Sequence, residues 1–540
     1  MYINQLTNYY MKIKFIILAL FAGAVVSAQQ MVFDPDFGVN GISVTAIDND
    51  TERSSDIEIQ QDGKILSVGF NRLATNSSYS YISLVRYLDN GSLDPDFGTA
   101  GVVTEHMNTE TRASGVKVQS DGKIIIAGYT QTSVLDHDAL IIRYNPDGTR
   151  DATFGDNGLI LLAEPGSAFG MTGRFSSLLI QPDDKILAGG MTNVYSETAG
   201  WYQGFALYLF NADGTPDSTF GVDGRAITDF DFITPDPWDE IVEDIEDIAL
   251  MPDGKIVVAT STFYNHIVSR LNADGTFDTA FGTNGSTVLN VNLFSRASLL
   301  LQQDGKPVIS GSAYPEGNGG QSALVHYLVR LTADGQFDSN FGFSGRMTSV
   351  FPGFAFRGGD AILLPDGKIL SAGYPFVTFV NLQSIVLIRY NSDGNYDDSF
   401  GPEGRQLFQF AENEGYNVSN LLMQEDGKIL LSGSTGINPD LNPPQDLFIM
   451  RMQEEELVSL NDNVFGSVTL YPNPASSAIT LANAENSTIE NLTVTDMTGK
   501  LVLSQKGNSP EINVEVLPAG IYFLNVSAQE GTQHLKFVEE

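Results

Sequence analysis

The stretch Asp94-Pro95-Asp96-Phe97-Gly98-Thr99-Ala100-Gly101 decides the fold, because its pattern Asp-x-x-Phe-Gly-x-x-Gly occurs seven times in the chain of 540 residues. Successive copies are 57 to 66 residues apart, a period typical of repeat architectures. The central phenylalanines are Phe37, Phe97, Phe154, Phe220, Phe281, Phe341 and Phe400. A second pattern, Asp-Gly-Lys before an apolar run, recurs in phase, with Asp183-Asp184-Lys185 as its one variant.

Each copy predicts four short strands, as the second copy illustrates. Residues 101–107 follow the Phe-Gly turn, residues 114–119 alternate between apolar and polar, and residues 123–129 and 139–144 are largely apolar. Short strands separated by Asp-Gly turns are typical of β-hairpins. The apolar run at residues 124–127 predicts a strand that is buried on both faces, as in stacked sheets.

Seven copies of four strands favour radial stacking into a β-propeller. The array begins at residues 33–38, late in a repeat, and ends at residues 448–452, in the strand that precedes that part. The first residues would therefore complete the last copy and remove a free sheet edge. We predict an all-β chain: a seven-bladed β-propeller of four-stranded blades over residues 29–455, closed by its termini, plus a small C-terminal β-sandwich.

The N-terminus has the pattern of a signal peptide over residues 1–28. Lys12 and Lys14 precede an apolar run at residues 15–26, and small residues end it at Ala28. The apolar run is too short to span a bilayer comfortably. We expect cleavage after Ala28, with Met11 as a possible alternative start.

The repeat pattern stops before an acidic linker at residues 456–463, and residues 464–540 have different signatures. These are Leu470-Tyr471-Pro472-Asn473-Pro474-Ala475, Asp496-Met497-Thr498-Gly499-Lys500, Leu517-Pro518-Ala519-Gly520-Ile521-Tyr522 and a lysine near the end, Lys536. This module resembles the type A C-terminal sorting domain of the type IX, or Por, secretion system. The repeats are similar to the delta-60 family of β-propeller repeats.

These resemblances imply how the protein folds and where it is delivered, and they imply no activity. The sorting domain implies that the type IX machinery is a partner of residues 464–540. It also implies release from the cell or attachment to its outer surface. The delta-60 resemblance implies a propeller and assigns no site residues.

The charge of the chain is strongly negative. Its 66 acidic and 29 basic residues give a formal net charge of −37, which repels phosphate backbones and makes nucleic acid an unsuitable partner. The charge suits either a soluble exported protein or one that binds cations. The absence of cysteine excludes disulfides and thiolate metal sites.

The aspartates of the repeated turns are open to two interpretations. A carboxylate there can cap its own turn by accepting backbone N–H groups. The oxygen ligands are also spaced somewhat as in calcium loops, although the closing bidentate Glu of an EF-hand loop is missing. The calcium candidates are Asp213, Asp217, Asp274, Asp278, Asp393 and Asp397. Calcium is accordingly a possible cofactor, and we name no other.

Two further residue sets recur in the repeats. An arginine recurs in the last apolar strand of six copies, with Leu209 in its place in the third, and we expect it to pair with a turn aspartate. His266 and His326 share a repeat position and form a weaker candidate for a metal site.

Departures from the repeat are candidates for ligand binding. Trp201 and Tyr202 lie in an insertion of the third copy, and Trp238 lies in a long acidic segment that follows it. They form either a surface that binds a glycan or a cation, or side chains that pack locally within solvated loops.

The sequence contains no recognisable catalytic constellation. It favours a secreted or cell-surface propeller that acts, as a monomer, as a non-enzymatic binding or adhesion module for a glycan, protein or matrix ligand. The alternatives are an extracellular propeller enzyme, such as a glycan lyase, hydrolase or lactonase, and a purely structural surface component.

Overall fold

A computed structural model describes most of the chain beyond residue 28. The described residues are 29–47, 51–73, 79–133, 136–162, 173–196, 200–228, 244–261, 265–291, 297–314, 324–351, 355–376, 384–410, 415–435, 445–456, 469–482, 489–496, 500–506, 511–528 and 531–539. The chain divides into a larger unit, residues 30–455, and a second unit that contains residues 456–540. The predicted signal peptide lies outside the described residues, as does nearly all of the predicted linker.

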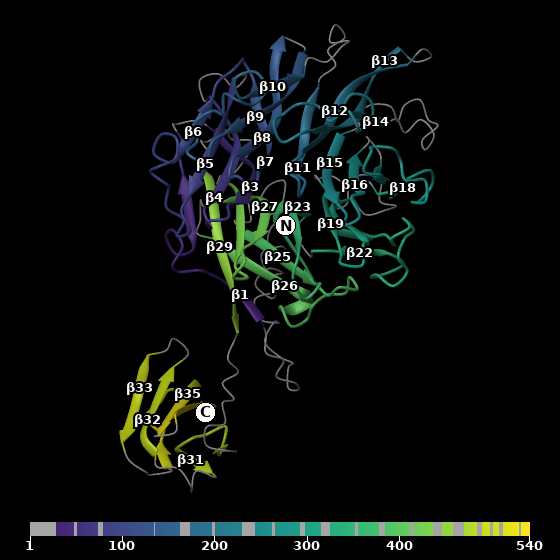
Figure 1. The fold of residues 1–540 in the computed structure, drawn as a ribbon. Helices are drawn as coiled ribbons and strands as arrows, with labels where there is room; N and C mark the ends of the chain where they lie inside the picture. Colours follow the sequence, from purple (N-terminus) through teal and green to yellow (C-terminus); the bar gives the residue numbers. More distant parts are fainter. Residues whose placement is uncertain are drawn as a thin grey trace, which may run out of the picture. The chain divides into compact units, whose positions relative to one another are not determined.

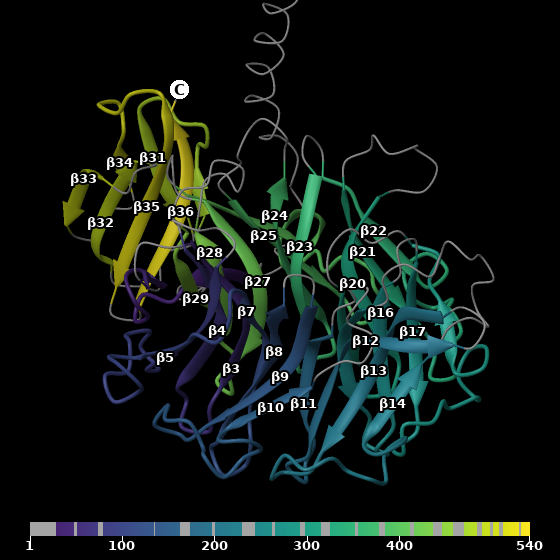
Figure 2. The same cartoon turned by 90° about the horizontal axis from the view of Figure 1, so that it is seen from above.

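In the larger unit, the described strands form seven antiparallel sheets (Figures 1 and 2). Six sheets each contain four consecutive strands, paired in sequence order. They are β3 (Thr51–Ile59), β4 (Ile65–Arg72), β5 (Ser80–Tyr87) and β6 (Val102–Glu105); β7 (Thr111–Val118), β8 (Ile124–Ser133), β9 (Asp136–Tyr144) and β10 (Leu159–Leu162); β11 (Arg174–Ile180), β12 (Ile186–Ser196), β13 (Gly200–Phe210) and β14 (Arg225–Thr228); β15 (Asp244–Leu250), β16 (Ile256–Ser261), β17 (His266–Leu271) and β18 (Ser286–Val288); β19 (Ser298–Leu301), β20 (Pro307–Ala313), β21 (Val325–Arg330) and β22 (Arg346–Ser349); β23 (Ala355–Leu363), β24 (Ile369–Phe376), β25 (Ser384–Tyr390) and β26 (Arg405–Gln409).

The seventh sheet combines the two ends of the repeat array. It contains β27 (Tyr416–Met423), β28 (Ile429–Thr435) and β29 (Leu447–Glu456), together with β1 (Gln29–Phe33) and β2 (Ile42–Thr45). Strand β2 pairs with β29 over four positions, from Ile42 opposite Met450 to Thr45 opposite Leu447. Residues 42–45 therefore stand where the other sheets have their fourth strand.

Apolar side chains pack between consecutive sheets. One buried cluster joins Leu66 and Leu84 of the first sheet to Ile124 and Leu140 of the second. Each of these side chains is fully buried, and full burial of such a side chain contributes about 1.5–3 kcal/mol. The core therefore lies between the sheets, as the apolar runs of the sequence predict.

The same packing joins the last sheet to the first. Leu430, Leu447 and Ile449 of β28 and β29 share a cluster with Ile57 and Val85 of β3 and β5. The innermost strands β27 and β3 also contact each other, as do the first strands of the other consecutive sheets.

The Phe-Gly turn explains why its residues repeat. Phe97 is fully buried in the cluster between the first two sheets, and its six equivalents are also fully buried. Gly98 has a φ of 53°, and a Cβ there would lie 2.5 Å from the carbonyl oxygen of Val102. The Gly98 N–H donates to the carbonyl of Asp147 in the next repeat, at 3.0 Å. Only glycine fits this turn without strain.

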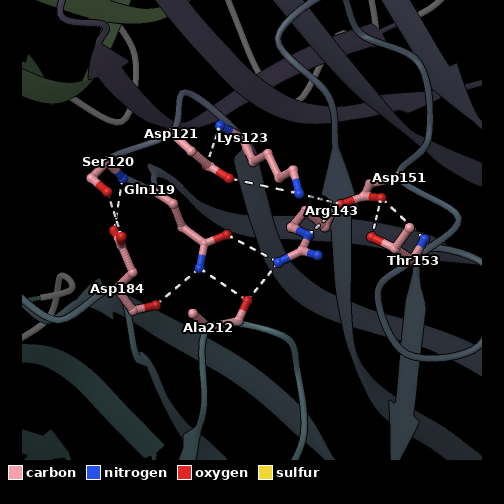
Figure 3. Close-up of polar contacts among 9 residues, drawn as sticks. All are labelled: Gln119, Ser120, Asp121, Lys123, Arg143, Asp151, Thr153, Asp184 and Ala212. Carbon is pink, nitrogen blue, oxygen red and sulfur yellow. Dashed lines mark hydrogen bonds and ion pairs between the residues drawn. The ribbon is translucent and has the colours of Figure 1, made fainter.

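A buried cluster of aspartate, arginine and lysine, the Asp–Arg–Lys cluster, holds each turn in place (Figure 3). In the second repeat, Asp151 accepts hydrogen bonds from Arg143 Nε at 2.8 Å and from the Thr153 N–H at 3.0 Å. Lys123 lies 3.1 Å from the same carboxylate. Arg143 stacks over Phe154, and its Nη1 donates to the carbonyl of Ala212 in the next repeat at 2.5 Å. One arginine thus connects two repeats.

The cluster recurs throughout the larger unit, which confirms the arginine–aspartate pairing predicted from the sequence. The Asp–Arg–Lys sets are Asp34–Arg451–Lys428, Asp94–Arg86–Lys64, Asp151–Arg143–Lys123, Asp278–Arg270–Lys255, Asp338–Arg330–Lys306 and Asp397–Arg389–Lys368. In the third repeat, where Leu209 replaces the arginine, Asp217 still pairs with the lysine of the cluster, Lys185. The cluster of Asp34 joins residues 417 positions apart.

The second unit is also all-β. One sheet contains β30 (Thr469–Tyr471), β31 (Ala478–Ala482) and β34 (Glu511–Asn513), and the other contains β33 (Leu501–Lys506), β32 (Ile489–Asp496), β35 (Gly520–Ala528) and β36 (Gly531–Glu539). Ile479 and Ile512 of the first sheet share a buried core with Leu492, Leu524 and Phe537 of the second. The two sheets therefore pack face to face, as the predicted sandwich requires.

Regular helix is scarce in the described residues: the structure assigns a short 3₁₀ turn at Pro402–Gly404 and no α-helix. Within the same residues, none of the helical structure is long and apolar enough to cross a membrane.

We expect the substitution Asp34→Asn to destabilise the larger unit by about 3 kcal/mol, because it leaves the buried guanidinium of Arg451 with only the exposed carboxylate of Asp89 as a partner. Thermal unfolding followed by tryptophan fluorescence measures this, since both tryptophans belong to the repeat array. Asp36→Asn is the matched control, because Asp36 is exposed and contributes only its backbone N–H to the cluster. Equal melting temperatures for the two variants would contradict the role given to Asp34.

Candidate functional site

Three of the calcium candidates are exposed turn aspartates whose oxygens already accept hydrogen bonds. Asp274 accepts the N–H of Thr276 at 3.0 Å and its hydroxyl at 2.6 Å, and Asp213 binds Thr215 in the same way. Asp393 accepts the backbone and side-chain N–H groups of Asn395, at 3.0 and 2.9 Å. These contacts are those of a capped turn.

The other three calcium candidates, Asp217, Asp278 and Asp397, are the buried aspartates of the repeated turns. Although burial raises the pKa of Asp397, its Ser399, Lys368 and Arg389 contacts lower it below the usual value. Within the described stretches of the chain, no three His, Asp or Glu side chains are grouped as a metal would require. Calcium binding stays a prediction, and the observed contacts favour the turn interpretation.

The two repeat histidines make separate contacts. His266 Nε2 lies 3.0 Å from a carboxylate oxygen of Glu246. His326 is fully enclosed between Ser310 and Tyr390, at 3.1 and 2.7 Å, and burial lowers its pKa to about 3. The structure gives these residues different partners and does not bring them to one site.

The aromatic candidates are only partly described. Trp201 and Tyr202 belong to β13, where their backbones pair with Tyr195 and Val194 of β12. Trp238 lies outside the described residues. A ligand surface at these positions therefore stays a prediction.

A different site, absent from the sequence-based candidates, lies among the innermost strands. A cavity of about 500 Å³, which we call the inner cavity, is lined by residues from the first strand of all seven sheets. Figure 1 shows these strands, β3, β7, β11, β15, β19, β23 and β27, around the middle of the larger unit. One equivalent position contributes the lining residues Asp56, Gly115, Ser177, Asp247, Ser298, Asp360 and Asn420. The volume is in the range of small-molecule sites.

Three of these positions carry aspartates that connect neighbouring sheets. A β-bulge immediately precedes Asp56. The Asp56 carboxylate accepts the N–H of Ile57 at 2.9 Å and that of Val116 in the next sheet at 3.0 Å. Asp247 and Asp360 repeat this arrangement. A bulge leaves backbone N–H groups outside the ladder, and a carboxylate satisfies them.

The charged side chains beside these aspartates are either paired with opposite charges or have a shifted pKa. Lys117 lies 3.0 Å from Asp56 and 3.1 Å from Glu58; burial lowers its pKa, but these two carboxylates raise it above the usual value. Burial raises the pKa of Asp360 to about 6, although the hydroxyl of Ser298 donates to it. This part of the cavity is a structural polar network.

Three residues before the position that Asp56 occupies, four of the seven copies have an arginine: Arg53, Arg112, Arg174 and Arg357. Arg112 and Arg357 line the inner cavity, together with the aromatic side chains of Phe70, Tyr129 and Tyr374. Each of these arginines lies nine residues before the first aspartate of the Asp-Gly-Lys pattern or its variant. Counting back from that pattern would have found them in the sequence.

The fold and the cavity define the class of the protein: an all-β repeat protein of the β-propeller type. Family models agree. The model described as "Domain of unknown function (DUF5122) beta-propeller" matches residues 119–154, 181–220, 252–281, 302–341 and 364–400. The model described as "Secretion system C-terminal sorting domain" matches residues 469–540. The delta-60 resemblance is compatible with the first match, and the sorting domain marks the chain for type IX export to the cell surface or beyond.

Solved structures with a similar outline are distant. Virginiamycin B lyase from Staphylococcus aureus is 11% identical, with 76% of this chain and 98% of that chain covered and a TM-score of 0.38. PorZ, a surface component of the type IX system of Porphyromonas gingivalis, is 10% identical, with coverages of 94% and 87% and a TM-score of 0.29. A Dyadobacter fermentans protein of unknown function is 12% identical, with coverages of 77% and 100% and a TM-score of 0.39. We draw no activity from similarities this low, and no curated protein matches the chain.

We expect millimolar calcium to leave the melting temperature of the full chain unchanged, because the candidate carboxylates already bind protein donors. A ligand at 100 times its Kd stabilises a folded protein by about 2.7 kcal/mol, which a thermal unfolding measurement detects readily. Magnesium at equal concentration controls for ionic strength. A calcium-specific rise that Asp274→Asn abolishes would instead establish a calcium site in the turn.

Proposed function

We propose that this protein is a non-enzymatic binding module that works at the cell surface or outside the cell, and that its ligand enters the inner cavity. The observation that carries the proposal is that all seven innermost strands contribute to one cavity of ligand size. The repeated aspartates, arginines and phenylalanines are committed to the scaffold. Residues that vary between repeats, such as those lining the cavity, are left to recognise a ligand.

We further infer that the seven sheets are the blades of one closed ring, with the inner cavity as its central channel. The pairing of β2 with β29, the Asp34–Arg451 ion pair and the apolar cluster of Leu430 and Ile57 support this inference. Closure removes the exposed sheet edges that an open array would present.

We propose the following route and boundaries. Residues 1–28 direct the chain to the periplasm, residues 29–455 form the propeller, residues 456–463 are the linker, and residues 464–540 engage the type IX machinery. The mature protein is then released or stays attached to the outer surface. It acts as a monomer.

Deletion of residues 464–540 should trap the protein in the periplasm of a host that has a type IX system. The measurement is immunodetection in periplasmic, surface and medium fractions. The full chain with Asp36→Asn is the control, because this variant keeps the sorting domain intact. Surface delivery of the deleted chain would refute the sorting role, whereas export of an unrelated periplasmic reporter fused to residues 464–540 would support it.

Binding of the full chain to a printed array of glycans and matrix proteins should depend on the inner cavity. We expect Ser419→Tyr to abolish binding, since Ser419 lines the cavity and a tyrosine would fill part of it. Val39→Tyr is the matched control, because Val39 is 76% exposed on a turn. Equal binding by the two variants would place the ligand elsewhere, and cleavage of a bound glycan would favour the enzyme hypothesis.

A further inference from the structure

One position of the innermost strands, immediately before Asp56 and its equivalents, carries a serine in four of the seven copies. These serines are Ser55, Ser114, Ser176 and Ser419. Two of them donate hydrogen bonds inside the scaffold: Ser114 to the carbonyl of Ala127 at 3.2 Å, and Ser176 to the carboxylate of Asp244 at 2.6 Å. A serine with a structural role at this position is therefore recognisable by its partner.

The other two serines lie on neighbouring sheets and line the inner cavity. Ser55 belongs to β3 and Ser419 to β27, and these two strands contact each other. Neither hydroxyl has a hydrogen-bond partner among the described residues. Because a hydroxyl both donates and accepts, this pair is left to bind a group that does the same.

A tyrosine of the sheet that precedes β27 adds a third such hydroxyl and an aromatic face. Tyr374 of β24 is half-buried and lines the cavity, and no described residue bonds to its hydroxyl or stacks on its ring. The other cavity aromatics are engaged. Arg112 lies over the Phe70 ring at 4.4 Å, and the Tyr129 hydroxyl donates to Glu110 at 3.1 Å. Tyr374 is thus available for a ligand with its ring as well as its hydroxyl.

The charges of the lining balance, which favours a neutral ligand. The charged lining residues are three carboxylates, Asp56, Asp247 and Asp360, and three cations, Arg112, Lys117 and Arg357. Lys117 lies 3.0 Å from Asp56 and Arg112 lies 3.0 Å from Glu110, while Arg357 also has a partner. The aspartates accept backbone N–H groups as well. A charged ligand would lose its hydration here without gaining a free counter-charge, which is costly.

The rest of the lining narrows the class of neutral ligand. Among the described lining residues, the aliphatic side chains larger than alanine are Leu178 and Val418, so a purely apolar ligand would make few contacts. Unengaged hydroxyls next to an aromatic face match a sugar ring, which has hydroxyls at its rim and an apolar C–H face. The cavity volume of about 500 Å³ suits one or two sugar units.

We propose that the inner cavity binds a neutral saccharide of one or two units, whose ring stacks on Tyr374 and whose hydroxyls bond to Ser55 and Ser419. This assignment rests on the proposed binding function and adds the class of ligand and its orientation. The ligand therefore lies against the sixth, seventh and first sheets, on the side of the cavity where the structure leaves polar groups unengaged.

The first test is calorimetric titration of the full chain with glucose, galactose and mannose, each compared with its uronic acid and its amino sugar. We expect at least one neutral sugar to bind. We expect its two charged counterparts to bind at least about tenfold more weakly, because each would bring an uncompensated charge into the cavity.

The second test uses variants of the full chain with the neutral sugar that binds. Ser419→Ala should weaken binding about threefold to tenfold, as for loss of a neutral hydrogen bond. Tyr374→Ala should weaken it more than Tyr374→Phe, since only the first removes the stacking ring. Ser218→Ala is the matched control, because Ser218 is an exposed serine of a Phe-Gly turn. Melting temperatures show that each variant is folded.

Tighter binding of a uronic acid or an amino sugar than of its neutral parent would overturn the neutral class. Unchanged binding in both Ser419→Ala and Tyr374→Ala would overturn the assigned contacts, and failure of all three neutral sugars to bind would overturn the whole inference. The proposed function stands in each of these cases if Ser419→Tyr abolishes binding to the printed array. It fails as well if that variant binds the array as the wild type does.

Discussion

The ion pair between the repeated aspartate and the repeated arginine is the interaction on which the larger unit depends. Taking a guanidinium out of water costs several kcal/mol, and only good geometry and further hydrogen bonds offset that cost. The aspartate supplies both. It binds Arg143 Nε at 2.8 Å and fixes the arginine over Phe154, so that its remaining N–H groups reach the next repeat. One carboxylate therefore stabilises the turn, the position of the arginine over the buried phenylalanine, and the contact between repeats.

This dependence explains why the third repeat can lack the arginine. When Leu209 replaces the arginine, no buried charge remains to be compensated on that strand, and Asp217 keeps Lys185, Thr219 and its turn. The neighbouring hairpin departs from the pattern too. Asp184, with a φ of 63°, replaces a glycine of the Asp-Gly-Lys turn and accepts the N–H of Ser120 from the preceding repeat at 2.7 Å (Figure 3). One link between repeats is lost there and another is gained.

The sequence predicts the parts of the fold that repeat. The buried phenylalanines, the positive φ of Gly98 and the arginine–aspartate pairs follow from period and turn chemistry, because every copy repeats the same local solution. The lysine of the cluster was not anticipated, since its Nζ meets the aspartate only after the hairpin folds back. The inner cavity was not predicted either. Its residues differ from copy to copy, and their proximity depends on which strand lies innermost.

That difference has a physical origin. Residues between sheets must satisfy the same packing and charge conditions in every repeat, so the same residue types recur there. Residues on the innermost strands face a shared space, where each sheet meets the side chains of several others, so identical residues would place seven like charges together. The chain instead has Asp56, Asp247 and Asp360 at this position in three sheets, and Gly115, Ser177, Ser298 and Asn420 in the other four. Similar repeats thereby line one cavity with residues that differ from sheet to sheet.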